Sequence, residues 1–295
     1  MSKLAARLKY RILRSPAAAL VKSARKMSLG PTLSRRDALA AQLPCDAAIS
    51  EHAAALARDG YVRLDDLVEP EALRALAIAA EARRMAGAKA AVPDGVSKKA
   101  FWSRLLDSDL VDGKLHVDSP FTRFALQPRL LGLLAKSFGA LPLLDYVLLT
   151  LSQPIEGELV QSQLWHRDHD DVRTIKLFVY LSDVQSAAHG PFSFMPGPVS
   201  DRIGPLMRSH SPDILIFARA KRSEMEQIIA PRLSVFAVET SRCLHMGSRV
   251  AQGHERLMFT ATYTTAPRVF GSGNSFVPVA PEDALIHAVL GQDLA

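Results

Sequence analysis

Residues 163–171 contain the densest group of potential metal ligands in the chain, and His166 and Asp168 stand two positions apart within it. In an extended strand such positions face the same side, so an imidazole and a carboxylate would project together. A second imidazole from elsewhere would complete a triad of two histidines and one carboxylate. That triad leaves adjacent coordination positions open and is typical of non-haem Fe(II) sites.

The same spacing recurs in His169 and Asp171. On a continuous strand this second pair would face away from the first, so the two pairs cannot serve one site. A short motif of this kind is weak, because it equally suits a surface network of ion pairs with Arg167 and Arg173. The motif therefore needs support from the rest of the chain.

The third ligand must come from another histidine, and His245 has the most suggestive position. It follows an expected strand, and Arg256 lies eleven residues further on, where a long final strand begins. Arg256 would share one strand face with Met258, Thr260 and Thr262, which suits a cavity that binds a carboxylate bidentately. Taken alone, an arginine in a strand is more often a surface residue. The remaining candidates are His52, His116, His189, His210, His254 and His287.

The first half of the chain is expected to be mainly helical. Apolar periodicity and the turn residues that bound it predict helices over 46–58, 69–85 and 127–138, with a short strand over 61–64. The glycine and proline content of 86–97 indicates a loop.

From residue 144 onward the pattern changes to short β-rich runs separated by turns. The expected strands are 146–152, 159–168, 174–181, 192–195, 233–238 and 257–264. No helix of crossover length lies between them, which argues against a parallel doubly wound sheet. We therefore predict a mainly β fold with flanking helices, in which residues 37–295 form one domain around a jelly-roll core at about 144–265.

The net charge of +6 is concentrated at the start of the chain. Residues 1–36 carry ten of the 36 basic residues and no acidic one, so the remaining residues carry −4. Nucleic-acid binding by the domain is therefore not indicated. The extension suits either an amphipathic helix on an anionic membrane or a poorly ordered arm. A secretory signal and a run of ~18 apolar residues are both missing from the sequence, which predicts a cytoplasmic protein with peripheral membrane contact left open.

The two cysteines, Cys45 and Cys243, are far apart and match no zinc or redox spacing. A structural disulfide is therefore not expected, and a reducing compartment is the default. Burial in the core is the simplest interpretation of Cys243.

Three motifs taken together are more specific than any of them alone. They are WHRD at 165–168, IKLFVYLSDV at 175–184 and GPFSFMPG at 190–197, followed by the pair His245 and Arg256. In their order and spacing they resemble the phytanoyl-CoA dioxygenase family over residues 146–265, and the helix-strand-helix lead-in from residue 46 is also similar to that family.

The resemblance implies a double-stranded β-helix in which His166, Asp168 and His245 bind Fe(II) and Arg256 binds the distal carboxylate of 2-oxoglutarate. It also favours His166 over His169, because a tryptophan precedes the first ligand in the family. Relatives that halogenate carbon replace the carboxylate ligand with a small residue, so the presence of Asp168 implies hydroxylation.

Some residues depart from the family or are ambiguous. The segment 198–200 lacks the serine and histidine that often follow the Pro-Gly of the family, and 200–231 aligns with nothing, which leaves the substrate open. Lys176, Phe178 and Tyr180 share a strand face and suit either core packing or contact with cosubstrate or substrate. Asp170, Asp171 and Arg173 suit either groups that orient His166 or a solvated charge network.

The predicted function is that of a dioxygenase that uses Fe(II), 2-oxoglutarate and O2 to hydroxylate an unactivated C–H bond of a small-molecule or lipid-like substrate. Two alternatives use a similar core. One is a jelly-roll binding or scaffold protein with a relic metal site, and the other is a cupin-like metal-dependent hydrolase or isomerase. The oligomeric state is not readable from the sequence.

Overall fold

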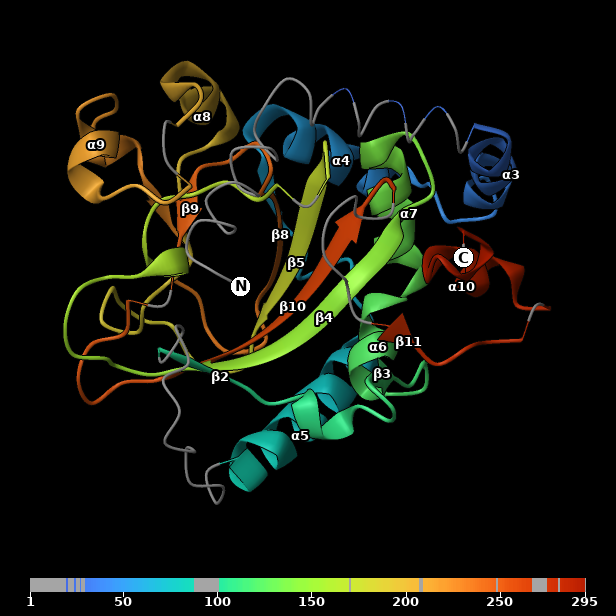
Figure 1. Cartoon of the computed structure of the whole chain (residues 1–295), viewed down its shortest axis with the longest axis horizontal. Coiled ribbons are helices and arrows are strands. Elements are labelled where there is room, and N and C mark those ends of the chain that lie inside the picture. Colours follow the sequence, from blue (N-terminus) through green and yellow to red (C-terminus); the bar gives the residue numbers. More distant parts are fainter. Residues whose placement is uncertain are drawn as a thin grey trace.

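A computed structural model describes residues 20, 24, 27, 30–87, 101–169, 171–206, 209–247, 249–266, 275–280 and 282–294. Its centre is an antiparallel sheet, and helices cover one face of that sheet (Figure 1). The loop 86–97 of the sequence analysis lies outside the described residues, apart from its first two residues, which end a helix.

The three expected helices are present, and their ends follow from capping. Helix α4 (Ala47–Asp59) begins after Asp46, whose side chain accepts a hydrogen bond from the Ile49 amide, and it ends at Gly60 in the left-handed conformation. Helix α5 spans Pro70–Gly87, and helix α7 spans Pro128–Phe138. The further helices are α3 (Gly30–Ala40), α6 (Pro120–Ala125), α8 (Gly197–Ile203), α9 (Asp213–Phe217) and α10 (Ala284–Val289).

The main sheet has six strands in the order β1-β8-β5-β10-β4-β2, and every neighbouring pair is antiparallel. The strands are β1 (Tyr61–Arg63), β2 (Trp102–Arg104), β4 (Leu143–Ser152), β5 (Thr174–Tyr180), β8 (Val235–Glu239) and β10 (Arg256–Thr264). A smaller sheet combines β6 (Ser193–Phe194), β7 (Glu226–Gln227) and β9 (His245–Met246) in the order β7-β6-β9. A parallel pair joins β3 (Lys114–Leu115) and β11 (Ser275–Phe276).

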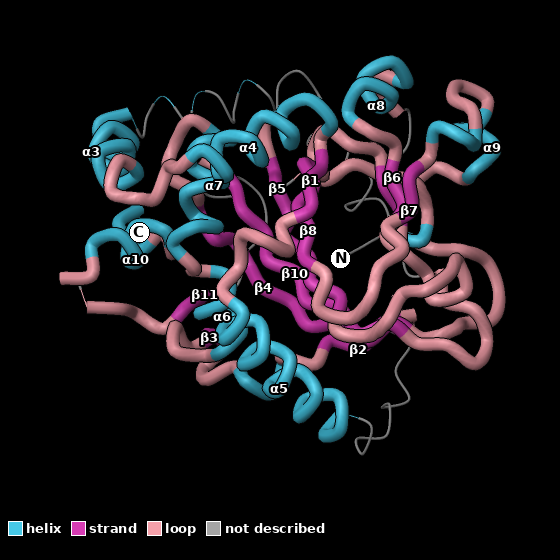
Figure 2. The backbone as a smooth tube through the Cα atoms, turned by 180° about the vertical axis from the view of Figure 1, so that it is seen from behind, coloured by secondary structure: helices cyan, strands magenta, loops and turns pink. Residues whose placement is uncertain are grey.

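The two faces of the main sheet bury different residues. On β10, Leu257 and Phe259 belong to the large core that the helices cover, whereas Met258 belongs to a second core on the opposite face. This is the alternation expected of a strand that is buried on both sides. Figure 2 shows α5, α6 and α7 over one face, with β6 and β7 set apart from the main sheet near α8 and α9. The inner face therefore looks toward the small sheet.

One expected strand is wrong. Residues 159–168 form no strand: a 3-10 helix, η2 (Gln161–Gln163), takes its middle part, and Trp165 and His166 make isolated bridges. Gln161 has a φ of 48°, a left-handed conformation that a strand cannot contain. Three further 3-10 helices are η1 (Asp107–Asp109), η3 (Arg222–Glu224) and η4 (Gln292–Leu294).

The extension is described in part. Helix α3 continues past residue 36, the last residue of the basic extension. The buried Arg36 donates hydrogen bonds to the Ala288 carbonyl at 2.6 Å and to Asp293 at 2.7 Å. These contacts fasten α3 to the end of the chain. Within the described residues, no helix has the length and apolar character that crossing a membrane requires.

Candidate metal centre

The structure brings His166, Asp168 and His245 together. One potential ligand atom from each lies within 4.8 Å of the other two. The His166 amide donates to the His245 carbonyl, and the His245 amide donates to the His166 carbonyl, both at 2.9 Å. The two rings therefore project side by side with centroids 4.2 Å apart, although the segments are almost eighty residues apart in sequence. Backbone pairing, rather than a regular strand, fixes these ligands.

Both imidazoles are held in the tautomer that a metal requires. His166 Nδ1 lies 2.9 Å from the Leu164 carbonyl oxygen, and His245 Nδ1 lies 3.0 Å from the Cys243 carbonyl oxygen. A carbonyl oxygen can only accept, so each Nδ1 must carry the proton and donate it. The lone pair is therefore on Nε2 in both rings. This is the usual arrangement for a metal-binding histidine, whose other nitrogen is fixed by a hydrogen bond.

The charges at the site also suit a cation. Burial lowers the pKa of His166 to about 3 and lowers that of His245, so both rings are neutral near pH 7. Burial by itself would raise the pKa of Asp168, but the neighbouring positive charges, that of Lys176 foremost, outweigh it, and the net shift is downward. Asp168 Oδ2 lies 3.7 Å from His245 Nε2. Two neutral nitrogen donors thus face an ionised carboxylate.

The close approach of α4 helps to place His245. Gly60, at the end of α4, has a φ of 78°, and a Cβ added there would lie 2.3 Å from the sulfur of Cys243. The Cys243 thiol donates to the Gly60 carbonyl at 3.5 Å. Any side chain at position 60 would push Cys243 away from Gly60. Because Cys243 lies two residues before His245, this contact helps to fix the position of His245.

The second pair of the same spacing lies elsewhere. Asp171 accepts hydrogen bonds from the Thr265 amide at 2.8 Å and the Thr265 hydroxyl at 2.7 Å, so it closes the end of β10. Arg173 forms an ion pair with Glu239 at 2.8 Å. These contacts give Asp171 and Arg173 structural roles, and neither His169 nor Asp171 belongs to the ligand cluster. Asp170 lies outside the described residues.

Trp165 and Arg167 alternate with His166 and Asp168 in sequence. Their side chains anchor the segment 165–168 to other parts of the chain. The Trp165 indole, which is fully buried, donates to Asp213 at 2.9 Å, and Arg249 binds both oxygens of the same carboxylate. Arg167 donates to the Ser200, Gly204 and Arg242 carbonyls. The helices α8 and α9 are thereby tied to the segment that carries the ligands.

Arg256 occupies the position expected of it. It opens β10 opposite Ser152 of β4, and its side chain is 1% exposed. Its guanidinium donates to the Gly190 carbonyl and lies 3.5 Å from the Ser152 hydroxyl. Burial lowers its pKa, but a guanidinium keeps its charge at any physiological pH. The inner face of β10 thus begins with a buried cation, followed by Met258 and two threonines.

Sequence reasoning missed two neighbours of the ligands. The ring of His210, in the segment between α8 and α9, stacks on His166 with centroids 5.0 Å apart. The Lys176 ammonium, on β5, lies 2.7 Å from Asp168 Oδ2. The sequence pattern predicted that Lys176 shares a strand face with Phe178 and Tyr180, but no local signal reveals which carboxylate it meets.

A divalent metal fits these residues. The donor set is two imidazole nitrogens and a carboxylate oxygen, which suits Fe(II) and related ions with positions left open. Asp168 Oδ2 is buried and makes no well-directed hydrogen bond in the described part of the chain, although the ammonium is close to it. A buried carboxylate oxygen with this capacity left over is the kind of group that a cation satisfies.

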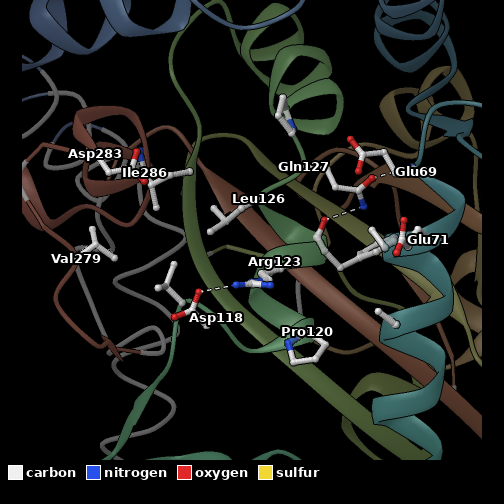
Figure 3. A pocket seen from close by; sticks show the side chains of 15 residues that line it. Glu69, Glu71, Asp118, Pro120, Arg123, Leu126, Gln127, Val279, Asp283 and Ile286 are labelled. Atoms are coloured by element: carbon white, nitrogen blue, oxygen red, sulfur yellow. Dashed lines mark hydrogen bonds and ion pairs between the residues drawn. The ribbon is translucent and has the colours of Figure 1, made fainter.

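A separate cavity lies on the helix-covered side of the molecule (Figure 3). It has a volume of about 620 Å³ and is lined by residues of α5, α6 and α10, including Glu71, Phe124 and Ile286. None of its lining residues belongs to the ligand cluster, so it is distinct from the metal centre.

No protein-family model and no curated protein matches the chain. Solved structures do match. The epimerase SnoN, in complex with Fe3+, alpha ketoglutarate and nogalamycin RO, is 18% identical with a TM-score of 0.51, over 79% of this chain and 96% of SnoN. EctD from S. alaskensis, with 2-oxoglutarate and 5-hydroxyectoine, is 18% identical with a TM-score of 0.51, and the match covers 81% of this chain and 86% of EctD.

AviO1 from Streptomyces viridochromogenes Tue57 is 16% identical with a TM-score of 0.50, over 76% of this chain and 100% of that protein. At these identities the likeness concerns the fold. Together with the antiparallel sheets and the flanking helices, it confirms the predicted fold class: the chain has a jelly-roll core of the double-stranded β-helix type.

Proposed function

We propose that this chain is a non-haem dioxygenase that uses Fe(II), 2-oxoglutarate and O2 to hydroxylate an unactivated C–H bond. The observation that carries the proposal is the cluster of His166, Asp168 and His245, in which both histidines hold Nε2 as the free donor. Proteins of this fold have been crystallised with iron and 2-oxoglutarate. The arrangement of residues and the fold support the same chemistry independently.

The residues divide the work between metal and cosubstrate. His166, Asp168 and His245 would hold the metal, and the hydrogen bonds of each Nδ1 would keep the rings oriented. Arg256 would bind the distal carboxylate of 2-oxoglutarate through its two terminal nitrogens. When bound, iron would activate O2, the oxidant, with 2-oxoglutarate supplying two electrons as it is oxidised to succinate and carbon dioxide, and this chemistry would hydroxylate an unactivated carbon. The apolar residues of the inner face, Phe178 and Met258 among them, would keep water away from the reacting groups.

Succinate formation tests the proposal. The protein, loaded with Fe(II) and given 2-oxoglutarate and O2, should release succinate at a slow rate even without its substrate. The His245→Ala variant should lose this activity and most metal binding, whereas His169→Ala should keep metal binding, because His169 lies outside the cluster. Normal iron occupancy in His245→Ala would contradict the ligand assignment.

The same assay separates the two alternatives. A binding or scaffold protein would release no succinate under any condition and would tolerate His245→Ala in its binding function. A hydrolase or isomerase would keep its activity without oxygen. Loss of all turnover under anaerobic conditions is the result that we expect.

We further propose a small-molecule or lipid-like substrate, and peripheral membrane contact through residues 1–36 remains a prediction. The ten basic residues of that extension would attract anionic lipid. A chain that begins at residue 30 keeps α3 and should bind anionic liposomes less than the full chain does. Equal binding of both chains would sink the idea.

A further inference from the structure

The ammonium of Lys176 is a cation that contacts one of the candidate metal ligands, Asp168. It lies 2.7 Å from Asp168 Oδ2, and the side chains of Lys176 and Asp168 are 13% and 14% exposed. Its Nζ also lies 5.7 Å from the centre of the Tyr146 ring, on the neighbouring part of the inner face. The lysine is therefore held within the site rather than extended into solvent.

The same carboxylate oxygen faces both the lysine and a histidine ligand. Asp168 Oδ2 is 2.7 Å from Lys176 Nζ and 3.7 Å from His245 Nε2. Two atoms that bind one metal ion with bonds of ~2.1 Å are at most ~4.2 Å apart, so the distance between His245 and Asp168 is short enough for a shared ion. An ion bound between His245 and Asp168 would thus approach the oxygen that the ammonium already contacts.

We propose that Lys176 is a positioning residue of the metal centre, an internal cation that holds Asp168 in place before metal binds and that the metal must displace or share. The proposal rests on the proposed function, since it requires that the cluster binds a metal. It goes beyond that function because it assigns a role to a residue that is neither a metal ligand nor the group proposed for 2-oxoglutarate.

Two physical effects of Lys176 both weaken metal binding, so that losing its ammonium should strengthen it. Without Lys176, the metal-free protein would contain a buried Asp168 without its nearest cation, and an uncompensated buried charge is costly. The metal-bound protein would not have this cost, because the ion itself neutralises the carboxylate. Lys176 also repels a dication directly. By linkage, a variant that loses the ammonium should therefore bind metal more tightly, while its metal-free form is less stable.

The experiment compares Lys176→Met with the wild type and uses Co(II) alone as the probe. Lys176→Met should lower the melting temperature of the metal-free protein and bind Co(II) about tenfold more tightly. Saturating Co(II) should restore most of the lost melting temperature. Lys176→Arg keeps a cation beside Asp168 and should resemble the wild type in both measurements. If Lys176→Met does not fold, Lys176→Gln provides the neutral variant and should show the same tightening.

A matched control comes from another ion pair at the start of the same strand. Arg173→Met breaks the contact between Arg173 and Glu239, whose side chains are 34% and 9% exposed and do not belong to the ligand cluster. It should destabilise the protein without changing Co(II) affinity. Equal or weaker Co(II) binding by Lys176→Met would overturn the role of Lys176 while leaving the metal site intact. Absence of Co(II) binding by the wild type would instead overturn both the metal site and this inference.

Discussion

Replacement of Arg256 by methionine should separate cosubstrate binding from metal binding. The Arg256 side chain is 1% exposed, so an anion that binds its guanidinium leaves water and pairs with a buried cation. Truncating one partner of a buried, hydrogen-bonded charge pair costs ~2–5 kcal/mol. Because ~1.4 kcal/mol is a factor of ten, Arg256→Met should weaken 2-oxoglutarate binding by at least about 30-fold. The affinity for metal should change little, since Arg256 is not among the clustered ligands.

The assay is calorimetric titration of the Co(II)-loaded protein with 2-oxoglutarate in the absence of oxygen. The variant also loses the hydrogen bond to the Gly190 carbonyl, so its folding must be controlled. Arg36 provides a match: it too is 1% exposed and donates to a backbone carbonyl, far away between α3 and α10. Arg36→Met should lower stability and leave 2-oxoglutarate binding unchanged. Wild-type affinity for 2-oxoglutarate in a folded Arg256→Met variant would refute the assignment of Arg256.

Three further predictions concern the groups around the site. The hydrogen bonds from Arg249 hold the pKa of Asp213 below its usual range, so the stability that this pair contributes is present above the unfolded pKa of ~3.9 and is lost as the pH falls through the folded pKa. Asp213→Asn should therefore lower the urea midpoint clearly at pH 7 and much less near pH 3, and an equal deficit at both would contradict the pairing. Trp165→Phe should cost ~1–3 kcal/mol in urea unfolding, because it leaves Asp213 one donor short and a gap in a fully buried position. Cys243 is buried and desolvation raises its pKa to about 12, whereas Cys45 is exposed, so a thiol reagent at pH 8 should modify one cysteine in the native protein and two after denaturation.

The parts of the fold that were predictable are those that local physics determines. The alternation of apolar and polar residues on β5 and β10 was visible in the sequence, and both strands are present with the expected inner and outer faces. The ends of α4 and α7 follow from Asp46, Gly60 and Gly139, whose capping roles are local. These elements needed no knowledge of distant contacts.

The parts that were not predictable depend on pairing between distant segments. His245 lies in a strand of two residues, which is too short for periodicity to indicate, and it forms through contact with β6. The choice between the two His-x-Asp pairs likewise depends on Thr265, which binds Asp171 from almost a hundred residues away. Resemblance to a family favoured His166, but periodicity alone left both pairs open. The predicted strand over 159–168 failed because the left-handed Gln161 interrupts it.

The missing strand over 159–168 and the clustering of His166 with Asp168 have a common explanation. A regular strand would place Trp165 and Arg167 on the face opposite His166 and Asp168, and the isolated bridges preserve this alternation over the residues that matter. The candidate ligands then lie beside His245, while the Trp165 indole and the Arg167 guanidinium bind α8, α9 and the loops around them. The segment 200–231, which contains α9, also carries His210 onto the His166 ring. A change in this segment can therefore alter the surroundings of the His166 ring while Trp165 and Arg167 keep the candidate ligands in register.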